Sequence, residues 1–181
     1  MRYWWVNQNK THKEELSGGF LWSPKTKITG GKNPFYDYMT EVRPGDIVFS
    51  YFQKKIGAIG VATTKAETTP KPDFGKAGEN WSSEGWLVKV EFTRLDNPLS
   101  PKEHWNSLLE LMPAKHAPLK ESGDGKEFYL TSLPENFSQK LIELIGDEFK
   151  PKVDRLINEI DEIELNNEST EEAIVGRTDI G

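Results

Sequence analysis

The stretch IVFSYFQKKIGAIGVA, residues 47–62, decides the fold class. Its two apolar runs, 47–52 and 56–62, are short and rich in β-branched and aromatic residues, which is typical of buried strands. The polar segment 53–55 between them predicts an antiparallel hairpin with a three-residue loop. Arg43-Pro44-Gly45-Asp46, just before the first run, predicts the turn that leads into it.

Further short strands and helices are expected on both sides of this hairpin. Residues 64–80, rich in Thr, Pro, Lys and Gly, predict a long loop. Apolar alternation, N-cap residues and first-turn prolines place the other elements. These are strands at 3–6, 20–22, 86–92 and 128–130, and helices at 34–39 (with Asn33 as N-cap), 101–112 (with Ser100 as N-cap) and 137–145. Thr11 and Glu14 fit a capping box for one more helix, which Gly18 and Gly19 would stop within two turns. Strands around short helices, without repeated βαβ units, predict an α+β fold with a mixed, strongly curved sheet or small barrel.

The acidic charge of the chain lies in its last part. The 181 residues carry a formal charge of -6, but residues 1–146 hold 19 Lys and Arg against 18 Asp and Glu, and 147–181 hold 4 against 11. Nineteen of the 20 aromatic residues also lie in 1–146. We therefore expect one folded domain over 1–146 and an acidic helical linker over 147–181. Residues 1–33 hold six basic and two acidic side chains, so the net charge does not exclude a nucleic-acid partner.

The composition argues against several other classes. No apolar run approaches the roughly 20 residues that a bilayer-spanning helix needs, and the first residues lack the pattern of a secretory signal. We therefore expect a cytoplasmic protein with no membrane partner. The chain has no cysteine, which excludes a disulfide, a thiol nucleophile and a cysteine zinc site within it. Its three histidines are scattered, so neither a metal nor another cofactor is expected.

The sequence holds weak candidates for catalysis. His116 is the only histidine in a loop with other polar groups, and no partner for it is evident. Ser122-Gly123-Asp124-Gly125 could present backbone amides to a phosphate, although such a segment is also an ordinary turn. No phosphate-binding loop or dinucleotide fingerprint appears. We therefore expect binding rather than catalysis, with no catalytic residue in this chain.

Aromatic residues beside loops carry the clearest functional signal. Trp22 ends a short strand next to Ser23, Phe35 and Tyr36 begin a short helix, and Trp81 borders the long loop. Large π faces near lysines suit stacking on a planar group such as an extruded base, worth roughly 1 to 3 kcal/mol per stack. Core packing is the alternative for each of these side chains.

Neutral amides lie near the same segments. Asn7 and Gln8 follow the first expected strand, and Asn33 precedes the short helix. An amide offers paired donors and acceptors, which suit the edge of a base. These residues therefore join the aromatic ones as candidates for a base-binding pocket.

Six segments in order resemble the N-terminal EVE domain of EVE-HNH endonucleases, which are bacterial modification-dependent restriction enzymes. The similarity covers residues 1 to about 146. Lys126 and Glu127 stand where the family pattern has Asn and Gln. The six segments are YWWVNQN at 3–9, GGFLWSPK at 18–25, NPFY at 33–36, PGDIVFS at 44–50, IGVA at 59–62 and PKPDFG at 70–75.

The resemblance implies a PUA-like curved β-barrel with peripheral short helices, followed by a C-terminal linker helix, and related to YTH and SRA readers of modified bases. It implies that the domain holds a flipped 5-methylcytosine or 5-hydroxymethylcytosine of duplex DNA, while a separate HNH nuclease domain cuts. The chain is then the specificity domain and linker of an enzyme that restricts modified foreign DNA in the bacterial cytoplasm. No HNH motif is present in it, and the divalent metal of such a nuclease would belong to that separate domain.

By position, the resemblance implies a pocket. Trp22 matches the tryptophan after the second strand of YTH-like domains, and Trp81 or Trp86 matches the one after the barrel hairpin. The other residues on pocket segments are Asn7, Gln8, Ser23, Asn33, Phe35 and Tyr36. The candidates for contacts to the DNA backbone are Lys10, Lys25, Lys27, Lys32, Lys71, His116, Ser122 and Gly123.

Three alternatives stay open at this point. The first is a reader of modified RNA or N6-methyladenine. The second is a small enzyme that depends on His116. The third is a protein-interaction module that dimerises through apolar residues at helical spacing in 153–163, and a homodimer of the full-length enzyme is compatible with the same segment.

Overall fold

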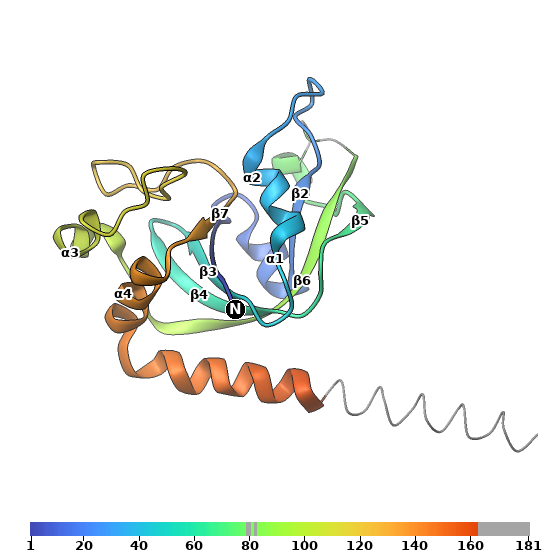
Figure 1. Ribbon diagram of the computed structural model, residues 1–181. Helices are drawn as coiled ribbons and strands as arrows, with labels where there is room; N and C mark the ends of the chain where they lie inside the picture. Colours follow the sequence, from blue (N-terminus) through green and yellow to red (C-terminus); the bar gives the residue numbers. More distant parts are fainter. Residues whose placement is uncertain (79–80, 82, 163–181) are drawn as a thin grey trace, which may run out of the picture.

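Strands and short helices alternate along the described part of the chain. The computed structural model describes residues 1–78, 81 and 83–162 (Figure 1). In chain order the elements are β1 (Tyr3–Asn7), α1 (His12–Gly18), β2 (Phe20–Pro24), α2 (Pro34–Asp37), η1 (Tyr38–Glu41), β3 (Ile47–Phe52), β4 (Lys55–Ala62), β5 (Glu67–Pro70), η2 (Gly75–Gly78), β6 (Glu84–Leu99), η3 (Pro101–His104), α3 (Trp105–Leu109), β7 (Leu130–Leu133), α4 (Glu135–Ile145) and η4 (Gly146–Glu148). A further helix covers 149–162.

The seven strands of the described residues belong to one mixed, curled sheet. Its order is β2-β6-β4-β3-β1-β7, with β5 also paired to β6. β1 pairs in parallel with β3, and the other pairs are antiparallel. The register shifts between Ser50 and Tyr51 and again between Ile56 and Ala58, and such bulges bend a sheet. The predicted α+β class with a strongly curved mixed sheet is confirmed (Figure 1).

The central strands of the sheet are buried on both faces. Side chains of β1 point alternately to opposite faces, so Trp5 joins one apolar cluster while Trp4 and Val6 join another. The Trp5 cluster includes Phe137 of α4, and the Trp4 cluster includes Leu21 of β2. A central strand with two apolar faces explains why 3–6 is a continuous apolar run rather than an alternating one.

Three predicted elements differ from the structure around the hairpin and the loop after it. The β3–β4 connection has two residues, because Gln53 and Lys54 adopt φ values of 51° and 65°, as in a type I′ turn. Segment 64–80 is not all loop, since it contains β5 and η2. The strand expected at 86–92 is the middle of the 16-residue β6, which is long enough to pair with β2 and β5 near its start and with β4 near its end.

Two capping predictions and one strand prediction are also corrected. Thr11 precedes α1, but its side chain makes no capping hydrogen bond. Ser100 likewise makes none, and the helix expected at 101–112 is a 3₁₀ turn followed by the short α3. The strand expected at 128–130 is shifted toward the C-terminus, since β7 covers Leu130–Leu133 and shares only Leu130 with the prediction. Asn33 does cap α2, accepting a hydrogen bond from the Phe35 backbone N–H at 2.9 Å.

The C-terminal helix, 149–162, starts inside the core. Phe149, Val153 and Leu156 are buried in the same cluster as Trp5 and Phe137. The hydrophobic core therefore continues past residue 146. The end of the segment considered for dimerisation, residue 163, lies outside the described residues. Within 1–78, 81 and 83–162, no helix combines the length and the apolar character needed to cross a bilayer.

Candidate functional site

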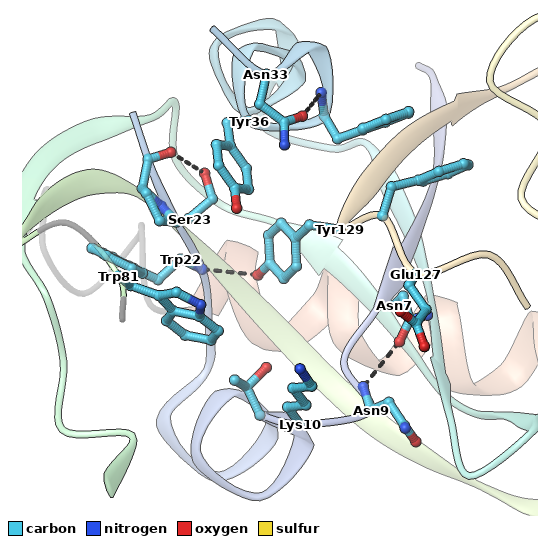
Figure 2. A pocket seen from close by; sticks show the side chains of 14 residues that line it. Asn7, Asn9, Lys10, Trp22, Ser23, Asn33, Tyr36, Trp81, Glu127 and Tyr129 are labelled. Atoms are coloured by element: carbon cyan, nitrogen blue, oxygen red, sulfur yellow. Dashed lines mark hydrogen bonds between the residues drawn. The ribbon is translucent and has the colours of Figure 1, made fainter. Parts of the chain in front are cut away.

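A cavity of about 550 Å³ opens between β2, α2 and the segment that leads into β7 (Figure 2). This volume lies within the range of small-molecule and cofactor pockets. Aromatic and polar side chains share its walls, as such pockets require. The lining residues are Asn7, Asn9, Lys10, Thr11, Trp22, Ser23, Pro24, Asn33, Phe35, Tyr36, Trp81, Glu127, Phe128 and Tyr129.

Two tryptophans form one wall of the cavity. The rings of Trp22 and Trp81 are nearly parallel, with an interplanar angle of 25° and centroids 6.3 Å apart. Phe74 packs against both rings from behind, at 5.9 Å and 5.3 Å. Trp22 is only 1% exposed, whereas Trp81 is half-buried, and Figure 2 shows its indole projecting toward the middle of the cavity. Trp81 therefore offers the more accessible aromatic surface.

The position of Trp22 is fixed by its strand neighbours. Its indole N–H donates a hydrogen bond to the Thr69 hydroxyl of β5 at 3.1 Å. Gly85, across the β2–β6 ladder, lies so close that a Cβ there would overlap the Trp22 ring and the Ser23 carbonyl oxygen. A glycine is therefore required at this point, because only its bare backbone leaves room for the indole.

Tyr129 links the cavity to a buried carboxyl group. Its hydroxyl donates to the Glu15 carboxyl group, at 2.7 Å and 2.9 Å from the two oxygens, and accepts from the Trp22 backbone N–H at 3.0 Å. Glu15 is fully buried and also accepts from the Gln8 amide at 2.5 Å. The Ser50 hydroxyl donates to the other end of the Gln8 amide. This network joins α1 to β2, to β3 and to the residue that follows β1, and it holds the tyrosine against the cavity.

Burial shifts the pKa of the two titratable groups in this network. Loss of solvent raises the pKa of Glu15 to about 8, although the hydrogen bonds from Tyr129, Gln8 and the Trp22 backbone oppose the shift. Burial also raises the pKa of Tyr129, and the neighbouring Glu15 adds to that effect. At neutral pH Glu15 is therefore mainly a neutral carboxylic acid, so the cavity has no fixed negative charge behind Tyr129.

The wall opposite the tryptophans is polar (Figure 2). Asn7 is held by two hydrogen bonds, one from its amide to the Lys126 carbonyl at 2.9 Å and one from the Asn9 backbone N–H at 3.0 Å. Asn33 lies at the upper end of the cavity, beside Tyr36 (Figure 2). It uses its carbonyl oxygen to cap α2, which leaves its amide N–H groups available to a ligand. The exposed Glu127 adds an acceptor on the same side of the cavity. Fixed donors and acceptors of this kind can read the edge of a planar polar group.

Phe35 and Phe128 close a third side. Their rings are stacked, with centroids 3.9 Å apart and planes 3° from parallel. His116 packs edge-on against Phe35 at 4.8 Å, and its Nδ1 forms a hydrogen bond with the Tyr38 hydroxyl at 2.9 Å. Burial, and then the nearby Lys115 and Lys126, lower the pKa of His116. This histidine therefore supports the aromatic pair from outside the cavity and is mainly uncharged at neutral pH.

The structure brings most of the predicted pocket residues together. They come from separate segments of the chain and now face one space. Those that line the cavity are Asn7, Trp22, Ser23, Asn33, Phe35, Tyr36 and Trp81, together with Lys10 from the predicted backbone contacts. Gln8 does not line it, because its side chain is buried beneath the cavity between Glu15 and Ser50. Trp86 also lies outside, with the Lys25 ammonium 4.2 Å from its ring centroid.

None of the other predicted backbone contacts lines the cavity. Lys25, Lys27 and Lys32 belong to the loop that joins Pro24 to Asn33. Lys71 is engaged within its own segment, where its ammonium donates to the Gly78 carbonyl at 2.7 Å. Ser122 bonds to Asp124 at 3.0 Å, and Gly123 packs on Lys102 of η3. These last two residues are therefore part of a turn that packs on η3 rather than of the cavity.

Several lining residues were not among the predicted ones. Tyr129 is central to the site, but the sequence FYL at 128–130 predicts a strand and gives no signal of a pocket. Asn9, Thr11 and Phe128 are brought to the cavity by contacts distant in sequence. Glu127 could have been noticed in the sequence, because it stands where the family pattern has Gln.

The arrangement suits binding more than chemistry. Aromatic faces, neutral amides, one lysine and the Glu127 carboxylate surround the space. These groups stack, donate and accept without a nucleophile and base in mutual contact. In the part of the chain that the structure describes, no group of three or more His, Asp and Glu side chains could hold a metal ion. What the geometry offers is a pocket for a flat ligand with polar edges.

Comparison with known proteins identifies the fold. No protein-family model and no curated protein matches the sequence. Among solved structures, the Pho92 YTH domain in complex with m6A superposes with a TM-score of 0.53 at 10% identity, covering 81% of this chain and 86% of that one. A protein from Leishmania major gives 0.50 at 12% identity, with 82% and 96% covered. Human THYN1 in complex with 5-methylcytosine-containing DNA gives 0.49 at 14% identity, with 81% and 99% covered. At such identities the likeness concerns the fold alone: the chain shares the curved α+β fold of the Pho92 YTH domain, as the resemblance in sequence implies.

Proposed function

We propose that the cavity binds a modified nucleobase, and that the chain recognises 5-methylcytosine or 5-hydroxymethylcytosine flipped out of duplex DNA. The observation that carries this proposal is the Trp22–Trp81 wall facing fixed amides across about 550 Å³. A flat base can stack on Trp81 while its edge meets Asn7, Asn33 or Glu127. The YTH domain of the same fold is in complex with a methylated base, which supports the class of ligand.

Flipping explains why such a cavity would be needed. A base inside a duplex presents only its edges, whereas both faces become available once it leaves the stack. The unstacking costs a few kcal/mol, which stacking and hydrogen bonds in the pocket must recover. The preference for cytosine rests on the resemblance to EVE domains of restriction enzymes, and N6-methyladenine is the second candidate because the Pho92 domain holds m6A.

The first prediction concerns selectivity. The chain is expected to bind a duplex with one 5-methylcytosine or 5-hydroxymethylcytosine at least tenfold tighter than the plain duplex, the factor that about 1.4 kcal/mol provides. Titration by fluorescence anisotropy at one fixed salt concentration measures this ratio. Equal affinities for all duplexes would refute the proposal. A preference for N6-methyladenine DNA or for methylated RNA would replace cytosine with the second candidate.

The second prediction concerns the lysines beside the cavity. Lys27→Ala and Lys32→Ala should each weaken the binding of modified and plain duplexes by the same factor, because phosphate contacts carry no base information. Each should also lower the slope of log affinity against log salt by about 0.9. Lys150→Ala is the matched control, since this lysine pairs with Asp154 on the C-terminal helix at 2.9 Å. A change in selectivity instead of the salt slope would contradict the assignment.

We further propose that the chain serves as the specificity part of an HNH restriction nuclease acting on modified foreign DNA. This step rests on the resemblance alone. An HNH motif in the reading frame that follows residue 181 would support it, and a continuing frame without one would contradict it. The mass in solution, measured with and without 147–181, tests whether that segment also forms a homodimer.

A further inference from the structure

The loop 25–32 leaves the cavity and returns to it. It starts after Pro24 and ends before Asn33, and both of these residues line the cavity. Two backbone hydrogen bonds shape it into a tight turn, from Gly30 N–H to the Lys27 carbonyl and from Lys27 N–H to the Gly31 carbonyl, each 2.8 Å. Ile28 and Thr29 occupy the centre of that turn. The tip of the loop is thus held in shape by the loop itself.

The tip projects away from the rest of the domain. Figure 1 shows the loop as the blue segment that extends above α2. Gly30, with φ of +87°, would have no atom within 4 Å of an added Cβ. Ile28 is 71% exposed. A large apolar side chain therefore stands in solvent at the end of a loop rooted in the cavity wall.

The charge of the loop suits a nucleic-acid partner. It contains three lysines and no carboxylate. Lys25 is held at the base of the loop by Glu84 at 3.3 Å and by the ring of Trp86. Lys27 and Lys32 are exposed, and neither pairs with a carboxylate of the described residues. The apolar tip is therefore flanked by cations that phosphates would attract.

We propose that Ile28 enters the base stack of duplex DNA and fills the space that the flipped base leaves, so that loop 25–32 is the element that extrudes the base. This inference rests on the proposed function, because it assigns a step of the same recognition event. Apolar wedges such as isoleucine separate base steps in several classes of DNA-binding protein. The lysines hold the phosphates on either side while the side chain replaces lost stacking contacts.

The location of Ile28 distinguishes it from other exposed apolar side chains. Single exposed apolar residues are common and need no explanation. Leu109 and Ile157, at 50% and 40% exposure, lie on α3 and on the C-terminal helix, on elements that do not line the cavity. Ile28 alone among these three is connected on both sides to cavity residues. A base leaving the duplex for the cavity would therefore vacate the stack near this tip.

The test compares a paired base with an unpaired one. The complete chain is titrated against a duplex with one 5-methylcytosine paired to guanine and against the same modified strand without its complement, with plain cytosine versions of both. An unpaired base is already free to enter the cavity, so a wedge has nothing to replace. Ile28→Ala is expected to weaken binding of the paired modified duplex by about tenfold and to leave the single strand within about twofold of the wild type. Ile28→Leu should retain the wild-type affinities, and Leu109→Ala is the control for loss of an exposed apolar side chain.

The two proposals fail in different ways. Wild-type chain that binds modified and plain single strands equally would overturn the proposed function, and the wedge with it. If the wild-type chain discriminates between modified and plain DNA, and Ile28→Ala binds the paired modified duplex with the wild-type affinity, only the wedge proposal is overturned. An equal loss on paired and single-stranded DNA would also overturn it, since Ile28 would then act as a general contact. Fluorescence of 2-aminopurine next to the modified base should rise with the wild type and stay low with Ile28→Ala.

Discussion

Trp81→Ala is expected to remove most of the preference for modified DNA while leaving affinity for plain duplex nearly unchanged. Trp81 is the half-buried member of the tryptophan wall, so the variant loses a stacking surface and little of the core. A base–aromatic stack is worth roughly 1 to 3 kcal/mol, which corresponds to about 5- to 150-fold in affinity. Anisotropy titrations with modified and plain duplexes at one salt concentration give both values.

The choice of Trp81 over Trp22 follows from burial. Trp22 is 1% exposed and is bonded to Thr69, and truncating a buried tryptophan costs about 3 to 5 kcal/mol of folding stability. Lost binding by Trp22→Ala would therefore not separate recognition from unfolding. Trp105→Ala is the matched control, because this half-buried indole packs against the other apolar cluster. Unchanged selectivity in Trp81→Ala would place the base elsewhere.

The free energy of unfolding of the wild-type chain is expected to fall as pH rises, and Glu15→Gln is expected to abolish this fall. The pKa of Glu15 is about 8 in the folded protein against 4.5 for the free side chain. Between these values the unfolded chain releases a proton that the folded chain retains, so the free energy of unfolding falls as pH rises through this window. The whole difference amounts to about 5 kcal/mol. The contribution of Glu15 to stability is fully present below pH 4.5 and is lost above pH 8.

Glutamine can replace the neutral carboxylic acid in the network. If its amide nitrogen faces Gln8, the Gln8 amide can turn, and the Ser50 hydroxyl can then accept instead of donate. Urea denaturation at several pH values between 4.5 and 8 measures the effect. The variant should be nearly flat across this range and more stable than wild type at its upper end. Glu14→Gln, on the same helix but outside the network, should keep the wild-type slope. A slope in Glu15→Gln equal to that of the wild type would show that other groups cause it.

The parts of the fold that follow from local pattern could be predicted from the sequence. The apolar runs at 3–6 and 47–62 identify central strands, because they must be buried on both faces. The two-residue turn at Gln53 and Lys54 could not be predicted, since neither residue is the Asn or Gly that positive φ values favour. The Asn9 side chain supports this turn by accepting from the Gln53 N–H at 3.0 Å. Asn9 and Gln53 are 44 positions apart in the sequence, so the residues next to the turn give no sign of this contact.

In the candidate site, too, residues with a local sequence signal could be predicted, and residues placed by contacts distant in sequence could not. Trp22, Asn33, Phe35 and Tyr36 could be selected because each is an aromatic or amide side chain beside a strand or helix end. Gln8 meets the same criterion, yet it is buried, because the partner that it satisfies is Glu15 on α1. A buried carboxyl group in a helix of mostly polar residues cannot be recognised from its neighbours in sequence.

The burial of Phe149, Val153 and Leu156 has a consequence for geometry at longer range. A helix anchored by three core contacts leaves the domain in one fixed direction and advances 1.5 Å per residue. A nuclease domain joined rigidly to this helix would lie at a fixed distance and direction from the bound base. A nuclease domain on a flexible linker would not. Its cuts would then lie within a narrow range of distances from each modified base. Sequencing of the cleaved ends would show that range as a sharp peak.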